Sequence, residues 1–229
     1  MPTAAINNIL LNSEILSTRD LSELINYIDT SKDIYELMPN GPGCDLYENG
    51  QPVSVKTVSF YKPDKKIQTV LDNLTSSLKK HVEFEYGQRL FLDPNFSGRI
   101  WSEGDYQSPH SDSEYNNATL CLDVDDSQTN WTNNIPRFLS DYSSLVYLND
   151  NYEGGELVFP EYNLNIKPKA GDIITFPTNA MYLHAVNKIK SGTRYNVVLK
   201  WFRQTTLISH VIPKNKAIQD LVKSFDGTI

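Results

Sequence analysis

The chain has 229 residues, of which 39% are hydrophobic and 21% are charged, and its formal net charge is -7. A chain of this length can bury a core of its own, and no segment approaches the roughly 20 consecutive apolar residues of a membrane-spanning helix. The net negative charge disfavours binding to a nucleic-acid backbone, which needs a basic surface. We therefore expect a globular protein with neither a membrane nor nucleic acid as its partner.

Two further observations bear on the compartment. The start of the chain has no basic segment ahead of an apolar run, so it does not look like a secretory signal. Cys44 and Cys121 lie far apart and form no Cys-x-x-Cys pair, so neither a disulfide nor a thiolate metal site is indicated. Both observations favour a cytoplasmic location.

The first predicted element is a helix over about 18–30. Ser17 and Asp20 stand three residues apart, as in a capping box, where side chains accept from the first free N–H groups. Apolar residues then recur at the spacing of one helix face, at Leu21, Leu24, Ile25 and Ile28. The helix is expected to continue toward Met38 and to end at the turn cluster Asn-Gly-Pro-Gly of residues 40–43.

A β-rich run and a second helix follow. The run VSVKTVSFY (53–61) has the β-branched and aromatic residues of a strand. Pro63 and Asp64 then open an amphipathic helix that is expected to run to about residue 81. His81 would lie at its C-terminal end, where a cation suits the helix dipole, so we interpret this histidine as structural.

From about residue 88 the pattern changes to short strands separated by turns. The runs are RLFLD, GRIWS, ATLCLDV, SLVYLN, ELVFP, NLNIKP, DIITFP, LHAVNKI and RYNVVLKWF. Such a series predicts an antiparallel sandwich or barrel, and hence a mainly β fold with flanking helices. We expect one domain, 1–229, with a helical support region (1–87), a β core (88–205) and a C-terminal helix (206–229).

A histidine and an aspartate stand two apart in QSPHSDSEY (107–115), where little is hydrophobic. On an extended chain residues i and i+2 point to the same side, so His110 and Asp112 can converge, unless both are solvated loop residues. His184, in MYLHAVNKI, adds a second imidazole, with a core histidine as the alternative. Two histidines and a carboxylate from separate strands form the facial triad of non-haem Fe(II) oxygenases, whose open face admits substrate and oxygen.

Arg194 follows His184 across a Ser-Gly-Thr turn at 191–193. If this turn is a hairpin loop, residues 190 and 194 pair, and His184 and Arg194 lie on the same face. An arginine inside a barrel is costly unless it meets an anion, so its position predicts an anionic ligand. A surface salt bridge at a hairpin end is the alternative.

In this order and spacing, four segments resemble the Fe(II)/2-oxoglutarate-dependent dioxygenases, and within them the prolyl-4-hydroxylase-like group. The segments are RIWSEGDYQSPHSDS, SSLVYLNDNYEGGELVFP, KAGDIITFP and HAVNKIKSGTRYNVVLKWF, within about residues 95–203. The resemblance implies a double-stranded β-helix, or jelly-roll, barrel that uses Fe(II), 2-oxoglutarate and O₂, with ascorbate as a possible addition. By the same resemblance, His110, Asp112 and His184 would hold the iron.

The resemblance also implies the cosubstrate contacts. Arg194 would pair with the distal carboxylate of 2-oxoglutarate, and Tyr147, in the Tyr-Leu-Asn motif, would hydrogen-bond it. Trp101 stands where the family often has a tyrosine; an indole keeps one N–H donor and loses the acceptor, so Trp101 is either a cosubstrate contact or a packed core residue. The implied reaction hydroxylates a substrate C–H bond and releases succinate and CO₂.

Three functional classes stay open: such a hydroxylase, a jelly-roll binding module without catalysis, and a zinc hydrolase using the same ligands. Arg194 and Tyr147 favour the hydroxylase, because a binding module has no use for a cosubstrate anchor. The suggested substrate is a prolyl residue in a peptide or protein, with a free amino acid or other small molecule as the alternative.

Two polar loops, 102–117 and 123–138, flank the H-x-D motif and carry Tyr106 and Trp131. Long loops on a rigid barrel are often binding elements, so we expect an extended peptide to lie across them, unless they are simply solvated. Their acidic residues would favour a neutral or basic segment.

Overall fold

The computed structural model describes residues 3–31, 34–37, 47–48, 51–52, 55–60, 63–93, 96–112 and 140–206. Its main sheet has the order β1 (Thr3–Ile6), β2 (Ile9–Asn12), β14 (Ile173–Pro177), β10 (Tyr142–Tyr147), β17 (Arg194–Arg203), β8 (Ser97–Trp101), β6 (Val55–Ser59) and β3 (Ile34–Leu37). In addition, β7 (Leu90–Leu92) pairs with β17. All of these pairings are antiparallel.

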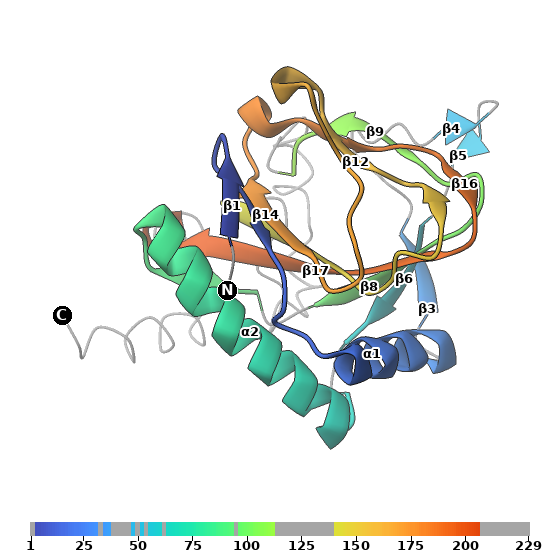
Figure 1. The fold of residues 1–229 in the computed structure, drawn as a ribbon, viewed down its shortest axis with the longest axis horizontal. Helices are drawn as coiled ribbons and strands as arrows, with labels where there is room; N and C mark the ends of the chain where they lie inside the picture. Colours follow the sequence, from blue (N-terminus) through green and yellow to red (C-terminus); the bar gives the residue numbers. More distant parts are fainter. Residues whose placement is uncertain are drawn as a thin grey trace, which may run out of the picture.

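A second sheet has the order β13 (Leu164–Ile166), β12 (Leu157–Phe159), β15 (His184–Val186) and β9 (Gln107–His110). Two short pairs complete the described strands: β11 (Glu153–Gly154) with β16 (Ile189–Ser191), and β4 (Tyr47–Glu48) with β5 (Gln51–Pro52). The helices are α1 (Thr18–Thr30) and α2 (Lys65–Tyr86), with one-turn 3-10 helices η3 (Pro160–Tyr162) and η4 (Ala180–Tyr182). In Figure 1, β9 and β12 lie above the main sheet, and the two long helices lie below it.

The two faces of the main sheet pack against different partners. On β17, the side chains of Val197, Leu199 and Trp201 join a core cluster that includes residues of α1 and α2. Val198 belongs instead to a cluster that Phe159 reaches from the second sheet. This alternation follows from the two-residue period of a strand. The sheets therefore enclose one interior, and the helices close the opposite face of the main sheet.

The first predicted helix is confirmed, but it ends earlier than expected. Ser17 Oγ accepts from the N–H of Asp20, and the Asp20 carboxylate accepts from the N–H of Ser17, which completes the predicted capping box. The expected continuation toward Met38 is wrong, because Ser31 already has extended dihedral angles and β3 begins at Ile34. This segment pairs with β6, so its β-branched and aromatic residues extend the main sheet.

The second helix is longer than predicted. Asp64 caps its N-terminus by accepting from two backbone N–H groups of the first turn. The helix passes residue 81 because Val82 continues the buried stripe, and it ends where Gly87 adopts the left-handed conformation. His81 therefore lies inside the helix, and its predicted place at the C-terminal end is wrong.

A close approach between α1 and the main sheet depends on Gly98 of β8. A Cβ atom at this position would lie 2.7 Å from Cδ1 of Ile28 and 3.1 Å from Cε2 of Phe60. Real Cβ atoms do not come within 3 Å of carbon, so a larger residue would push α1 away. The helical support and the β core are thus packed directly against each other.

The N-terminal part contributes strands as well as helices, because β1, β2, β3 and β6 all belong to the main sheet. The division at 1–87, 88–205 and 206–229 stays a prediction, and the expected C-terminal helix lies almost wholly outside the described residues. Among the helices that the structure describes, none has the length and apolar character needed to span a membrane.

Candidate active site

The predicted metal ligands come together at one point between the two sheets. His110 ends β9 and His184 begins β15, and the two residues are directly paired in the second sheet, with ring centroids 4.2 Å apart. Asp112 follows two residues after His110, and the ligand atoms of all three side chains lie within 4.8 Å of one another. The expected convergence of the H-x-D motif is therefore present in the structure.

Hydrogen bonds orient both imidazoles for metal binding. Nδ1 of His110 lies 2.9 Å from the carbonyl oxygen of Ser108, and Nδ1 of His184 lies 3.1 Å from that of Tyr182. A carbonyl oxygen can only accept, so each Nδ1 carries the proton and each Nε2 keeps its lone pair. Burial lowers the pKa of His110. The pKa of His184 is lowered to about 3, first by burial and then by the neighbouring His110 ring. Both rings are therefore neutral, as a metal ligand must be.

Asp112 is held by two donors from the main sheet. Lys200 Nζ and Ser143 Oγ each lie 2.5 Å from Oδ2 of Asp112, and Lys200 also donates to Ser143 Oγ at 2.7 Å. Burial of Asp112 opposes ionisation, but the Lys200 ammonium holds the pKa of this carboxyl well below its usual value. The carboxylate is therefore charged. Neither Lys200 nor Ser143 was among the residues predicted for the site.

Arg194 lies at the other end of the same interior and is only 1% exposed. Its Nη2 donates to Tyr147 Oη at 3.2 Å. Its Nε and Nη1 have no hydrogen-bond partner among the described residues. Buried guanidinium N–H groups without acceptors are costly, so the side chain is suited to an anion that enters the site.

Arg194 is brought to the cavity by a strand pairing that differs from the one predicted. The turn at 191–193 does not close a hairpin: β16 pairs with β11, whereas Arg194 at the start of β17 pairs with Trp101 on β8. The expected pairing of residues 190 and 194 is therefore wrong. The turn carries the chain onto the main sheet, and Gly192 at its centre has φ 81°, a conformation that favours glycine. His184 and Arg194 nevertheless line the same cavity.

Two aromatic side chains flank the guanidinium. Its Cζ lies 5.0 Å from the ring centroid of Trp101 and 4.9 Å from that of Tyr147. The Trp101 indole N–H is already used, because it donates to Oδ1 of Asn196 at 2.8 Å. Trp101 therefore presents its ring face to Arg194, and its one donor serves a protein side chain. Burial raises the pKa of Tyr147, so its hydroxyl stays protonated and can donate.

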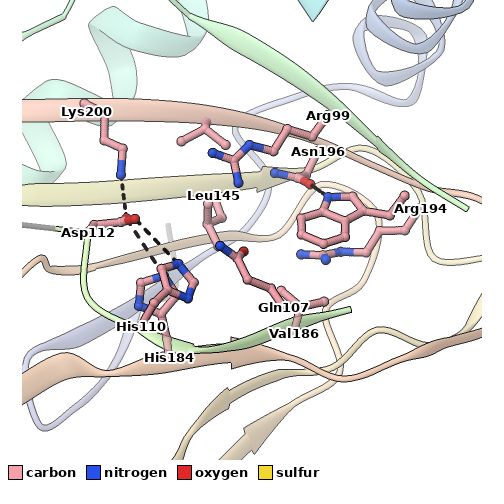
Figure 2. Close-up of a pocket in the computed structure, with 12 residues that line it drawn as sticks. Arg99, Gln107, His110, Asp112, Leu145, His184, Val186, Arg194, Asn196 and Lys200 are labelled. Atoms are coloured by element: carbon pink, nitrogen blue, oxygen red, sulfur yellow. Dashed lines mark hydrogen bonds and ion pairs between the residues drawn. The ribbon is translucent and has the colours of Figure 1, made fainter. Parts of the chain in front are cut away.

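One cavity connects the metal ligands with Arg194, and Figure 2 shows the three ligands at one end and Arg194 at the other. Its lining combines charged, polar and apolar side chains: Arg99, Trp101, Gln107, His110, Asp112, Leu145, His184, Val186, Arg194, Asn196, Val198 and Lys200. The sequence contained a signal for several of the residues that were not predicted. Positions 196, 198 and 200 follow Arg194 at the two-residue period of a strand, and Arg99 precedes Trp101 by the same step.

The predicted substrate loops are described only in part. Residues 113–139, with Trp131 and the acidic segment at 123–126, lie outside the described residues. Tyr106, in the part of the first loop that is described, does not line the cavity. A role of these loops in binding stays a prediction.

Comparison with known proteins gives matches over the same region. Residues 99–203 match the family model of the 2OG-Fe(II) oxygenase superfamily. A stretch of 67 residues is 42% identical to prolyl 3-hydroxylase 2 of Homo sapiens, and it makes up 27% of this chain and 9% of that relative. The chain thus matches about a tenth of the length of this curated relative.

Two solved structures have the same fold. The viral collagen prolyl hydroxylase from Paramecium Bursaria Chlorella virus-1, in its 2OG complex, superposes with a TM-score of 0.59 at 19% identity, covering 85% of this chain and 96% of that one. The prolyl hydroxylase from Trichoplax adhaerens, in complex with a hypoxia inducible factor peptide fragment, gives 0.63 at 15% identity, covering 89% and 87%. At these identities the likeness establishes the fold alone, and it confirms the predicted jelly roll.

Proposed function

We propose that this chain is a 2OG-Fe(II) oxygenase, the superfamily whose model matches residues 99–203, and that it hydroxylates a prolyl residue in a peptide or protein. Fe(II) and 2-oxoglutarate are the cofactor and cosubstrate that the family name states, as predicted from the sequence. Succinate and CO₂ are the expected coproducts. The similarity to prolyl hydroxylases, one of them bound to a peptide, supports this substrate class.

The observation that carries the proposal is the pairing of a metal site and a carboxylate site in one cavity. Two neutral imidazoles and a carboxylate match the ligand set of a non-haem Fe(II) centre. Arg194, with two nitrogen atoms, Nε and Nη1, that have no protein acceptor among the described residues, matches a carboxylate. A zinc hydrolase would need the metal site but not the carboxylate site, and a binding module without catalysis would need neither.

Each part of the cavity has a distinct task in the proposed reaction. When bound, Fe(II) would activate O₂, which is the oxidant, while decarboxylation of 2-oxoglutarate to succinate and CO₂ would supply two electrons and the substrate C–H bond the other two. Arg194 and the Tyr147 hydroxyl hold the distal carboxylate, and the flanking rings keep water from the guanidinium. The apolar side chains of Leu145, Val186 and Val198 line the space between the two ends and suit the methylene groups of the cosubstrate.

The proposed function is tested by turnover with defined peptides. The purified chain, supplied with Fe(II), 2-oxoglutarate and ascorbate in air, should release succinate faster when proline-containing peptides are added. Mass spectrometry should find one added oxygen on a prolyl residue, in an amount equal to the extra succinate. Peptides with proline replaced by alanine serve as the control, and succinate release that no peptide stimulates would contradict the prolyl assignment.

A second candidate, the hydroxylation of a free amino acid or other small acid, is favoured by Arg99. This guanidinium comes from β8, and Figure 2 shows it extending over the middle of the cavity, between Asn196 and the metal end. A cation in this position suits a substrate that carries its own carboxylate close to the reacting carbon. The same assay with free amino acids in place of peptides separates the two: coupled succinate release with an amino acid, lost in Arg99→Leu, would select the small substrate.

A further inference from the structure

We propose that Lys200 is a positioning residue for the metal centre: together with Ser143 it fixes the Asp112 carboxylate so that Oδ1 alone is presented to the metal. The inference rests on the proposed function for the identity of the metal, Fe(II). It assigns a task to a buried cation that neither chelates the metal nor touches the carboxylate anchor at Arg194.

The three side chains form a closed set of hydrogen bonds. Lys200 donates to Oδ2 of Asp112 and to Ser143 Oγ, and Ser143 therefore directs its own proton to the same Oδ2. Oδ2 lies 3.9 Å from Nε2 of His184 and accepts from two donors, whereas Oδ1, 3.8 Å from Nε2 of His110, has no such donor in the described part of the chain. A carboxylate fixed in this way can offer one oxygen to a metal but not both.

Strand pairing explains why the donors arrive together. Ser143 on β10 and Lys200 on β17 are directly opposite each other in the main sheet. Asp112 comes from the end of β9 in the second sheet, so the contact joins the two sheets at the metal. Figure 2 shows Lys200 reaching Asp112 from the side opposite the two histidines. Because a loop residue is otherwise free to rotate, this contact fixes the one ligand that does not lie in a strand.

Burial gives the contact its strength. Lys200 is 8% exposed and Ser143 is fully buried, so water cannot replace either donor. Partners of this kind, which orient metal ligands, typically change metal affinity by about 10–100-fold when they are removed. A cation so close to the metal also repels it. We expect the effect of orientation to outweigh this repulsion, and the change in metal affinity when Lys200 is replaced measures the balance.

The test is metal binding without cosubstrate or substrate. Binding of Co(II) and of Fe(II) under anaerobic conditions is measured by titration calorimetry for the wild-type chain and for Lys200→Met, Lys200→Gln and Ser143→Ala. The visible spectrum of bound Co(II) reports the coordination. We expect Lys200→Met to lower affinity about 10–100-fold and to alter the spectrum. Lys200→Gln keeps a donor and should lose less, as should Ser143→Ala.

Lys167→Met is the control, because Lys167 is a lysine that also makes hydrogen bonds within the chain, but it is exposed and donates to the carbonyl oxygens of Tyr152 and Gly154. Its metal affinity should equal that of the wild-type chain. Unchanged or tighter binding in Lys200→Met would overturn the inference. If Lys200→Met does not fold, the inference would be overturned by Lys200→Gln and Ser143→Ala both having the metal affinity and Co(II) spectrum of the wild-type chain. Failure of the proposed function looks different: the wild-type chain would bind the metal yet not turn over 2-oxoglutarate.

Discussion

The two faces of the main sheet are built from the same strands, but the outer face is packed with apolar side chains and the inner face carries charged and polar ones. On the outer face of β17, apolar side chains pack against α1 and α2, and the one polar atom of Trp201 is satisfied by Ser144. On the inner face, Arg194 keeps N–H groups for which the described residues offer no acceptor. Within the described residues, the outer face is packed by the chain itself, whereas we expect a ligand to complete the inner face. Changes on the inner face should therefore reduce binding and turnover, and changes on the outer face should reduce stability.

The largest effect is expected at the metal ligands. His184→Ala removes one of the two imidazoles, and turnover of 2-oxoglutarate should fall to background, because two ligands cannot hold the metal in place. The far-ultraviolet circular dichroism spectrum should stay that of the wild-type chain. Metal binding by calorimetry and succinate release give the measurement. Wild-type iron content and activity in this variant would remove His184 from the site.

The next largest effect concerns the carboxylate anchor. Arg194→Ala should raise the 2-oxoglutarate concentration needed for half-maximal turnover, because loss of one partner of a buried ion pair costs about 3–5 kcal/mol, or roughly 10²–10⁴-fold. Metal affinity measured without 2-oxoglutarate should change little. A variant with an unchanged concentration dependence would show that the cosubstrate carboxylate binds elsewhere.

A change on the outer face should lower stability and leave 2-oxoglutarate binding unchanged. Leu199→Ala deletes a fully buried side chain in the cluster with the helices and should lower the free energy of unfolding by about 2–5 kcal/mol. Urea unfolding followed by tryptophan fluorescence measures this loss. Below the unfolding transition, the half-saturating 2-oxoglutarate concentration should equal that of the wild-type chain. A loss of affinity as large as that in Arg194→Ala would show that the two faces are coupled.

The smallest effect is expected from a single hydroxyl group. Tyr147→Phe keeps the ring beside Arg194 and removes one donor to the distal carboxylate, which should cost about 0.5–1.5 kcal/mol in cosubstrate binding. The half-saturating 2-oxoglutarate concentration should rise by roughly 2–13-fold. A rise as large as that in Arg194→Ala would mean that the hydroxyl also holds the guanidinium in place.

The structure brings the residues that the sequence singled out to one cavity, but not by the strand pairing that was expected. His110, Asp112 and Arg194 were recognisable because metal ligands and a buried cation are rare residue types in strands. The hairpin at 191–193 was wrong because neighbouring runs of β residues do not show which sheet each run joins. Lys200 lies on the same face of β17 as Arg194, but it was missed because a lysine in a strand is usually solvated. Only the tertiary fold brings Asp112 to it.

The predicted ends of the two helices were wrong because tertiary packing outweighs the local sequence pattern. The stretch after Ser31 has apolar residues that fit a helix, yet pairing with β6 draws it into the sheet. In α2, one more buried residue, Val82, and the position of Gly87 set the true end. Both errors concern the ends of elements, where local propensity is weakest.

The strand order of the main sheet also has a consequence for how the chain folds. Among the described strands, β1 and β3 form the two edges, and both precede residue 40, whereas the central strands β10 and β17 come much later. During synthesis the edges therefore exist before the strands that must lie between them. Sheets made of such distant pairings fold slowly and leave unpaired strands exposed in the meantime. We expect this chain to complete its sheet only after β17 has left the ribosome, and to depend on the early helices to shield its apolar strands until then.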